Sequence, residues 1–257
     1  MRMRIQEMAG KTGLPQPVVE KDYALSHLLA GIASHPVLGD TLVFKGGTAL
    51  KKLFFGDYRF SEDLDFSAMD APTGDALEAA FREAVAVAGR SLSEHGPFLL
   101  ETERYLERDP HPHGQEAFIV RVKFPWHPSA LCRIKTEITH DEPVLLPPEK
   151  RPLIHGYEEE LAANVLAYRL EEIVAEKLRS LLQTRKKLVE RGWNRPRARD
   201  YYDLWRILDA FGASLDRTVL PSLLERKCRH REVGYRGIED FFGKELLAEA
   251  RRHWDAN

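Results

Sequence analysis

The most constraining feature of the sequence is the block of residues 44–67, which predicts a strand, a tight turn, a short helix and a second strand. The apolar run 42–44 stops at Gly46 and Gly47, where backbone without a Cβ can bend sharply. After an amphipathic segment, residues 60–67 alternate between apolar and polar side chains, which is typical of a strand with one buried face. The block is therefore expected to form part of a sheet.

Both halves of this block carry groups with a defined chemistry. Thr48 is expected at the N-cap of the short helix, where its hydroxyl and the first free N–H groups of the helix favour an anion. Asp63 and Asp65 project to one side of the second strand, and such carboxylates repel each other unless a cation lies between them. Oxygen ligands of this kind suit Mg²⁺ or Mn²⁺. Together the two halves predict chemistry on a nucleoside triphosphate (NTP).

Each half also has an ordinary interpretation. A Gly-Gly turn and a solvated Asp-x-Asp strand face are both common, so either motif alone indicates little. Their proximity makes the combination more specific. The sequence contains no Gly-x-x-x-x-Gly-Lys-Ser/Thr motif, which excludes a P-loop.

The pattern along the chain predicts two lobes. The chain has 257 residues, 43% of them hydrophobic, which is enough for one large core or two modest ones. Helices are expected at residues 17–34 and 74–95, and strands at 98–106, 117–124 and 131–140. The sequence after Pro147-Pro148 is mainly helical in pattern. We therefore expect an α+β catalytic lobe over residues 1–155 and a helical lobe over residues 156–257.

Several features limit the cellular setting and the metal chemistry. No apolar run approaches the roughly 18 residues of a membrane span, and the N-terminus lacks a signal-like apolar segment, so we expect a cytoplasmic protein without a membrane partner. Cys132 and Cys228 have no zinc-like spacing. His111 and His113 lie in a proline-rich loop with no third ligand nearby in sequence, which favours a surface turn over a metal site.

The predicted strand around residues 132–139 offers a third carboxylate. Its polar positions include Arg133, Lys135 and Glu137. If this strand lies beside the strand of the two aspartates, Glu137 completes a set of three acidic ligands and leaves an ion free positions for triphosphate oxygens and an attacking hydroxyl. The alternative is an exposed strand face on which Glu137 forms a salt bridge with a basic neighbour.

Two charges interrupt apolar stripes in the predicted helices. Lys177 lies within the stripe of the helix at 169–190, and Asp200 heads the stripe of the helix that runs to Phe211. In the ordinary interpretation, the Lys177 stem carries its ammonium to water and Asp200 is an N-terminal acid favoured by the helix dipole. In the functional one, Lys177 reaches into a cleft and holds a triphosphate as a point charge.

Basic residues concentrate in the helical part of a chain whose net charge is −2. Residues 169–199 carry ten Lys or Arg against four Glu, and a second basic cluster occupies residues 226–231. Such segments are commonly solvated helix faces balanced by acids. Next to a nucleotide site, they are equally consistent with contact to a nucleic-acid backbone.

These motifs, in this order, resemble those of the AbiEii/AbiGii (MenT-like) nucleotidyltransferase toxins of the DNA polymerase β-like superfamily. The resemblance rests on Lys45-Gly-Gly-Thr-Ala-Leu with Arg59-Phe-Ser-Glu-Asp-Leu-Asp-Phe66, on Ala175-Glu-Lys-Leu-Arg179, on Arg199-Asp-Tyr-Tyr-Asp-Leu204, and on Val19-Glu-Lys-Asp-Tyr23. The superfamily usually has Gly-Ser about ten residues before Asp-x-Asp. Here Thr replaces Ser and the interval is longer.

The resemblance implies both a fold and a function. The fold would be α+β, with a polymerase β-like lobe whose mixed sheet is flanked by helices, followed by a helical lobe. The protein would be the toxin of a toxin–antitoxin or phage-defence pair, with a cognate antitoxin as partner. It would add nucleotides to the 3′ end of tRNA, which blocks aminoacylation and translation. Lys177 and Asp200 match the lysine and aspartate that the family requires for activity.

We therefore expect the protein to use Mg²⁺ or Mn²⁺ as cofactor and an NTP as substrate. The expected catalytic residues are Asp63, Asp65, Lys177 and Asp200; the metal ligands are Asp63, Asp65 and Glu137; the nucleotide-binding residues are Gly46, Gly47, Thr48, Arg59, Ser61 and Lys177. Three alternatives stay open: a transferase acting on a protein or small-molecule hydroxyl, a non-catalytic nucleotide-binding module, and a two-metal nuclease.

Overall fold

The computed structural model describes residues 1–106, 114–194 and 196–254, and the chain divides into the units Met1–Tyr168 and Arg169–Asn257. The sequence pattern predicted a boundary near residue 155. The structure has it later because the strand β7 (Asn164–Ala167) still pairs within the sheet of the first unit.

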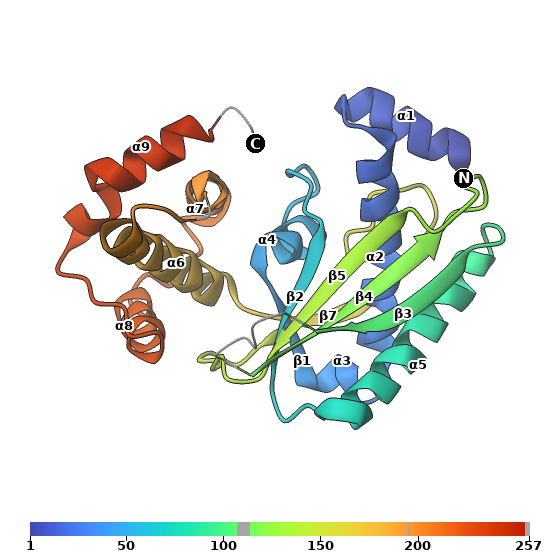
Figure 1. The fold of residues 1–257 in the computed structure, drawn as a ribbon, viewed down its shortest axis with the longest axis horizontal. Coiled ribbons are helices and arrows are strands. Elements are labelled where there is room, and N and C mark those ends of the chain that lie inside the picture. Colours follow the sequence, from blue (N-terminus) through green and yellow to red (C-terminus); the bar gives the residue numbers. More distant parts are fainter. Residues whose placement is uncertain (107–113, 195, 255–257) are drawn as a thin grey trace. The chain divides into compact units, whose positions relative to one another are not determined.

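A mixed sheet forms the centre of the first unit. In the described residues it has seven strands in the order β3-β4-β5-β2-β1-β7-β6 (Figure 1). Besides β7, the strands are β1 (Leu42–Lys45), β2 (Asp63–Ala68), β3 (Leu99–Tyr105), β4 (Gln115–Lys123), β5 (Cys132–Thr139) and β6 (Glu149–Pro152). The pairs β1–β7 and β2–β5 are parallel and the other pairs are antiparallel. The strands that carry the predicted carboxylates are thus neighbours near the middle of the sheet.

Helices cover this sheet and complete the core of the first unit. They are α1 (Arg2–Thr12), α2 (Gln16–Ser34), α3 (Leu38–Thr41), α4 (Gly46–Ala49), which continues into the π-helical turn η1 (Leu50–Phe54), and α5 (Gly74–Ser93). The long helices α2 and α5 lie side by side against the sheet (Figure 1). A Cβ on Gly31 of α2 would lie 2.4 Å from the carbonyl oxygen of Ala84 in α5, so glycine permits this close approach. Phe81 of α5 stacks on Phe118 of β4 with ring centroids 4.5 Å apart.

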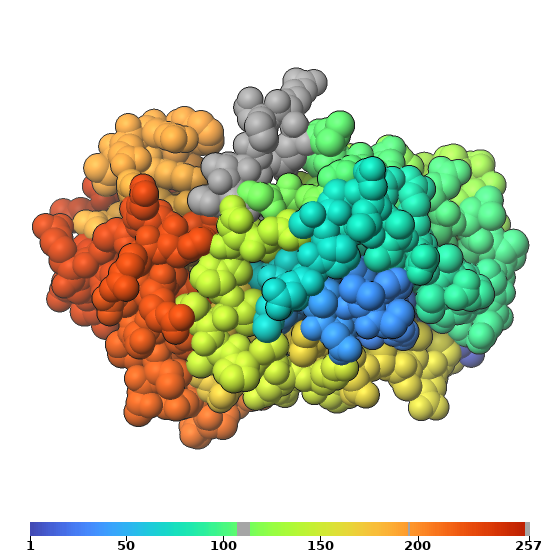
Figure 2. All heavy atoms as spheres, turned by 90° about the horizontal axis from the view of Figure 1, so that it is seen from below, coloured from blue at the N-terminus to red at the C-terminus, as the bar shows by residue number. Residues whose placement is uncertain are grey.

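The short helix α3 lies near the start of α5 (Figure 1), and the blue surface of this part of the chain adjoins the teal surface in Figure 2. Lys150 of β6 forms an ion pair with Asp40 of α3 at 2.7 Å. The strands β7 and β6 form one edge of the sheet, and the sequence pattern predicted neither of them. The reason is physical: β6 is mostly exposed and shows no alternation of buried and exposed residues.

The second unit is helical. Its elements are α6 (Leu170–Arg191), α7 (Ala198–Phe211), α8 (Leu220–His230), the 3₁₀ turn η2 (Ile238–Phe242) and α9 (Lys244–Arg252). Leu182 of α6 packs with Leu224 and Cys228 of α8 in the core of this unit. The helix α6 is followed by Gly192, whose φ of 75° gives the left-handed C-cap that glycine adopts without strain. Among the described residues, no helix is long and apolar enough to cross a membrane.

Candidate active site

Three carboxylates meet at the pairing of β2 with β5. The parallel register sets Asp65 opposite Glu137 and Asp63 opposite Lys135. This confirms the expectation that the strand carrying Glu137 lies beside that of the two aspartates. The salt bridge of the alternative interpretation also forms: Lys135 Nζ lies 2.5 Å from Glu137 Oε1, and the same oxygen accepts a hydrogen bond from Gln115 at 2.6 Å. Glu137 is therefore held in place from two sides while it faces Asp65.

The two aspartates of this cluster are costly to ionise. Burial and the charge of Glu137 raise the pKa of Asp65 to about 7, and Lys45 offsets part of that shift. Burial also raises the pKa of Asp63, against the opposing effect of Lys21. Buried acids close to one another keep their charge at low cost only when a cation binds them. The raised pKa values of Asp63 and Asp65 therefore favour the binding of a cation.

The glycine turn packs directly against this cluster. Gly46 has a φ of 81°, and a Cβ there would lie 2.8 Å from Asp65 Oδ2. A Cβ on Gly47 would lie 2.6 Å from Arg59 Nη2. Gly46 is therefore needed for its left-handed backbone and its close approach to Asp65, whereas Gly47 leaves room for the end of the Arg59 side chain. The turn, Asp65 and Arg59 form one compact group within the first unit.

Two details of the predicted turn are wrong. The helix α4 begins at Gly46 with Lys45 as its N-cap, so Thr48 is inside the helix and not at its N-cap. The Thr48 hydroxyl is buried and donates a hydrogen bond to the carbonyl oxygen of Asp63 at 2.6 Å, which ties α4 to β2. The strand β2 begins only at Asp63, so strand alternation does not place Ser61 with the two aspartates.

We expect Gly46→Ala to lower the rate of the predicted nucleotidyl transfer by at least about tenfold. A displacement of about 1 Å near reacting groups can lower a rate by about a hundredfold. The new methyl group would collide with Asp65 Oδ2, and the left-handed backbone adds strain. Initial-rate measurements at saturating substrate test this expectation.

Gly13→Ala is the matched control for this substitution. Gly13 has a similar φ of 68°, but in the described part of the chain no atom from a residue beyond its own sequence neighbours lies within 4 Å of the added Cβ. The Gly13→Ala variant should lose stability through its strained backbone, as Gly46→Ala does, but it should keep the wild-type rate of transfer. Equal rates for Gly46→Ala and the wild type would show that the turn does not shape the site.

In the second unit, Lys177 is the centre of a buried ion cluster. Its Nζ lies 3.0 Å from Asp200 Oδ1 and 2.5 Å from Asp203 Oδ2. The ammonium therefore does not extend to water along its stem, as the ordinary interpretation required. Although burial lowers the pKa of Lys177, the two carboxylates outweigh that effect and the pKa is raised. The cation is thus kept charged and fixed in position.

Sequence reasoning missed two of the charged residues that contact these groups. Asp203 is fully buried and makes the shorter of the two contacts with Lys177. Its signal was a second acid one turn after Asp200 on an otherwise apolar helix face. Lys45 ends β1 opposite Asp65 and lowers the pKa of that carboxyl. Its signal was a lysine that closes an apolar strand next to the glycines.

The expected site residues fall into two sets. One set belongs to the first unit and comprises Gly46, Gly47, Thr48, Arg59, Ser61, Asp63, Asp65 and Glu137. Lys177 and Asp200 belong to the second unit. The loop histidines His111 and His113 lie outside the described residues.

The glycine turn beside a carboxylate cluster on a mixed sheet is the arrangement expected of a nucleotidyltransferase. A family model described as the nucleotidyl transferase AbiEii toxin of type IV toxin–antitoxin systems matches residues 27–257. The chain belongs to this family, so it is a nucleotidyltransferase and a toxin of the type IV class. The family implies an NTP substrate and an antitoxin partner, and it generally uses a divalent metal.

Comparison of structures confirms the fold. The chain is similar to MenT4, a nucleotidyltransferase toxin of Mycobacterium tuberculosis H37Rv, with a TM-score of 0.58 and 22% sequence identity. The match covers 88% of this chain and 71% of that chain. The predicted α+β nucleotidyltransferase fold is therefore correct. No curated protein sequence matches the chain.

Proposed function

We propose that the chain transfers a nucleoside monophosphate from an NTP to the 3′ end of tRNA, in a metal-dependent reaction that blocks aminoacylation and so translation. A terminal hydroxyl of the tRNA gives up its proton and bonds to the α-phosphorus, and the bond from that phosphorus to the β-phosphate breaks, so that pyrophosphate leaves. The observation that carries this proposal is the register of β2 with β5. It sets Asp65 opposite Glu137, with Asp63 on the same strand as Asp65 and the Gly46 turn in contact with Asp65.

The residues fit a divalent ion such as Mg²⁺ or Mn²⁺. Asp63, Asp65 and Glu137 would hold it, since they supply only oxygen ligands and two of them have pKa values raised by burial and neighbouring charge. When bound, the ion neutralises charge on the triphosphate and orients the acceptor hydroxyl. In our proposal this is the reason for assembling acids that destabilise one another.

The other residues bind and orient the substrate. Gly46 and Gly47 let the phosphates approach the backbone closely, and Arg59, which lies against Gly47, adds positive charge there. Lys177 binds the triphosphate as a point charge, while Asp200 keeps its ammonium charged and in position. Asp200 therefore acts as a positioning residue.

Two further residues of the block have smaller parts. Thr48 supports the turn through its bond to the Asp63 carbonyl, so the substrate meets its backbone and not its hydroxyl. Ser61 lies just before β2 and supplies a polar group near the nucleotide.

An RNA acceptor is supported by the surface of the helical unit. Arg191 and Arg199 are exposed, and so is Trp193 between them in the sequence, with 70% of its surface accessible. Trp205 of α7 is 56% exposed. Arginines bind phosphates and aromatic rings stack on unpaired bases, which a tRNA 3′ end provides. The basic cluster at 226–231 contributes less than expected, because Lys227 is fully buried against Glu172 at 2.9 Å.

Incubation with each labelled NTP in turn, Mg²⁺ and total RNA tests the proposal. The label is expected in tRNA, and oxidation of the tRNA 3′-terminal diol with periodate should abolish it because the acceptor hydroxyls are destroyed. The Asp65→Asn variant serves as the inactive control.

The same reaction distinguishes the alternatives. Label in a protein would favour a transferase that acts on a protein hydroxyl. Shortened RNA without label would favour a nuclease. NTP binding without any labelled product would favour a nucleotide-binding module. Each of these results would contradict the tRNA assignment.

A further inference from the structure

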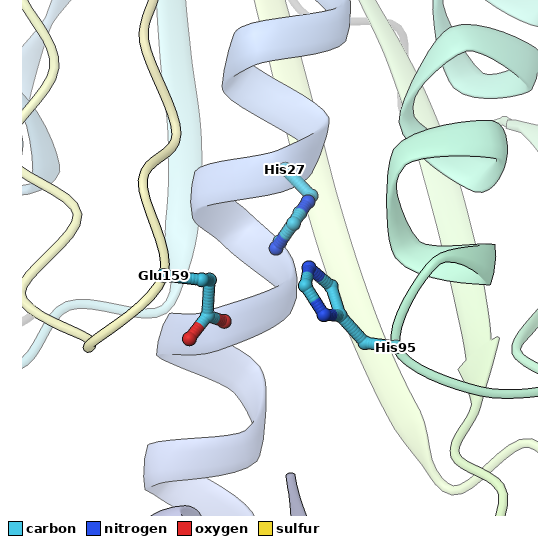
Figure 3. A group of neighbouring side chains, drawn as sticks. All are labelled: His27, His95 and Glu159. Atoms are coloured by element: carbon cyan, nitrogen blue, oxygen red, sulfur yellow. The ribbon is translucent and has the colours of Figure 1, made fainter.

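A second cluster of metal-ligand side chains lies inside the first unit, around His27. This histidine comes from α2, His95 follows the end of α5, and Glu159 lies in the segment before β7. The three side chains point toward one another (Figure 3). One ligand atom from each lies within 4.8 Å of the other two. Their wide separation in sequence explains why no spacing motif revealed them.

His27 is the fixed member of the cluster. It is fully buried, and its Nδ1 lies 3.0 Å from Ser91 Oγ. Its Nε2 is also buried and has no hydrogen-bond partner within the described part of the chain. When Nδ1–H donates to Ser91, Nε2 carries a lone pair aimed at the cluster, as in histidines that bind metals. A buried nitrogen without a partner is costly, and an ion would satisfy it.

The protonation states suit a metal as well. Burial and the neighbouring His155 and His95 lower the pKa of His27 to about 3, so its imidazole is neutral near pH 7. Burial alone would raise the pKa of Glu159, but the Tyr23 hydroxyl, the backbone and His155 lower it to about 2. A neutral imidazole and an ionised carboxylate are the forms that bind a metal without first losing a proton.

We propose that His27, His95 and Glu159 bind one divalent transition-metal ion of the Zn²⁺ type, at a site separate from the catalytic carboxylates. Two imidazole nitrogens and one carboxylate oxygen are a donor set typical of zinc, whereas Mg²⁺ prefers oxygen ligands alone. The ion would link α2, the end of α5 and the segment before β7. The bound ion is expected to stabilise the first unit.

The ligands must draw closer when the ion binds. Zinc–ligand bonds of about 2.0–2.1 Å place tetrahedral ligand atoms about 3.3 Å apart, so no separation between the ligand atoms has to shorten by more than about 1.5 Å. His95 and Glu159 lie outside regular elements and can make this movement, whereas His27 is held in a buried helix.

Two existing contacts of Glu159 bear on this movement. Arg4 Nη1 lies 3.3 Å from its Oε2, and His155 Nε2 lies 3.4 Å from its Oε1. The Arg4 side chain is 42% exposed and can turn to water. His155 is buried beside His27, with ring centroids 5.3 Å apart, so it can keep its hold on Glu159 or become a fourth ligand. Neither contact prevents the ion from binding.

Metal titration of chelator-treated protein tests the proposal. The Asp65→Asn background is used to disable the catalytic carboxylates. Zn²⁺ at a hundredfold excess over its dissociation constant should raise the Tm by about 5–10 °C. Co²⁺ should give the visible absorption of an ion bound by imidazole, while Mg²⁺ should produce neither effect.

Variants identify the ligands. His95→Ala and Glu159→Gln should each weaken Zn²⁺ binding by at least about a hundredfold. The matched control is His253→Ala, which removes a partly exposed histidine of the second unit that pairs with Glu249 at 3.3 Å. It should bind Zn²⁺ as the parent does, and the Tm of each metal-free variant confirms that it folds. Equal Zn²⁺ affinity in His95→Ala and the parent, or no Co²⁺ absorption in the parent, would overturn the proposal.

Discussion

Asp65→Asn is expected to lower nucleotidyl transfer by on the order of a thousandfold while the protein stays folded. A lost electrostatic contact to a transition state typically costs a hundredfold to a thousandfold, and Asp65 is the proposed metal ligand that lies opposite Glu137. Asparagine keeps the shape of the side chain next to Gly46 but removes its charge. Single-turnover rates at several Mg²⁺ concentrations measure the effect.

Asp70→Asn provides the matched control. It makes the same chemical change two residues after the end of β2, at an exposed position with a φ of 55° that asparagine also tolerates. Its transfer rate should equal that of the wild type. A rate within tenfold of the wild type for Asp65→Asn would remove Asp65 from the catalytic set.

Asp65→Asn should also stabilise the metal-free protein. The folded-state pKa of Asp65, about 7, lies above the value near 4 of an unfolded chain, so ionisation favours unfolding. The contribution of Asp65 to stability is therefore present below pH 4 and is lost as the pH rises through 7. The Tm of Asp65→Asn should exceed that of the wild type by a margin that grows from pH 5 to pH 8. Mg²⁺ should reduce this margin, because it binds the carboxylates of the wild type.

Local patterns in the sequence predicted the strands and helices of the site but not how they pair. Alternation in 60–67 and 132–139 indicated strands, and the acids on the polar side of that alternation predicted a metal site. The register of Asp65 with Glu137 is a long-range pairing, which no local pattern specifies. The helices α2, α5, α6 and α7 were predicted because each buries a broad apolar stripe.

The errors came from contacts that a local pattern does not contain. Thr48 was predicted at an N-cap because its residue type favours that position, but the helix starts earlier and the hydroxyl bonds to the Asp63 carbonyl instead. The partners of Lys177 include Asp203, which is 26 residues away in sequence. The cluster around His27 combines segments from α2 to the region before β7. Each of these outcomes is decided by tertiary packing and not by residue preference.

Lys177→Met is expected to abolish transfer and also to destabilise the helical unit. The substitution leaves Asp200 and Asp203 buried without their shared cation, and removal of one partner from a buried ion cluster typically costs about 3–5 kcal/mol. For a chain of this size that corresponds to a fall in Tm of about 6–20 °C. Differential scanning calorimetry measures the loss.

Because loss of stability alone could reduce activity, a second variant separates the two roles of Lys177. In the double variant Lys177→Met with Asp203→Asn, the fully buried carboxylate becomes neutral while Asp200 keeps its contact with Arg197 at 3.4 Å. Most of the lost stability should return, since the remaining acid is partnered. Transfer should stay absent, because Lys177 is the cation that we propose for the triphosphate. Recovery of transfer together with the Tm would mean that Lys177 is structural and that the positive charge on the triphosphate comes from residues such as Arg59 and Lys45.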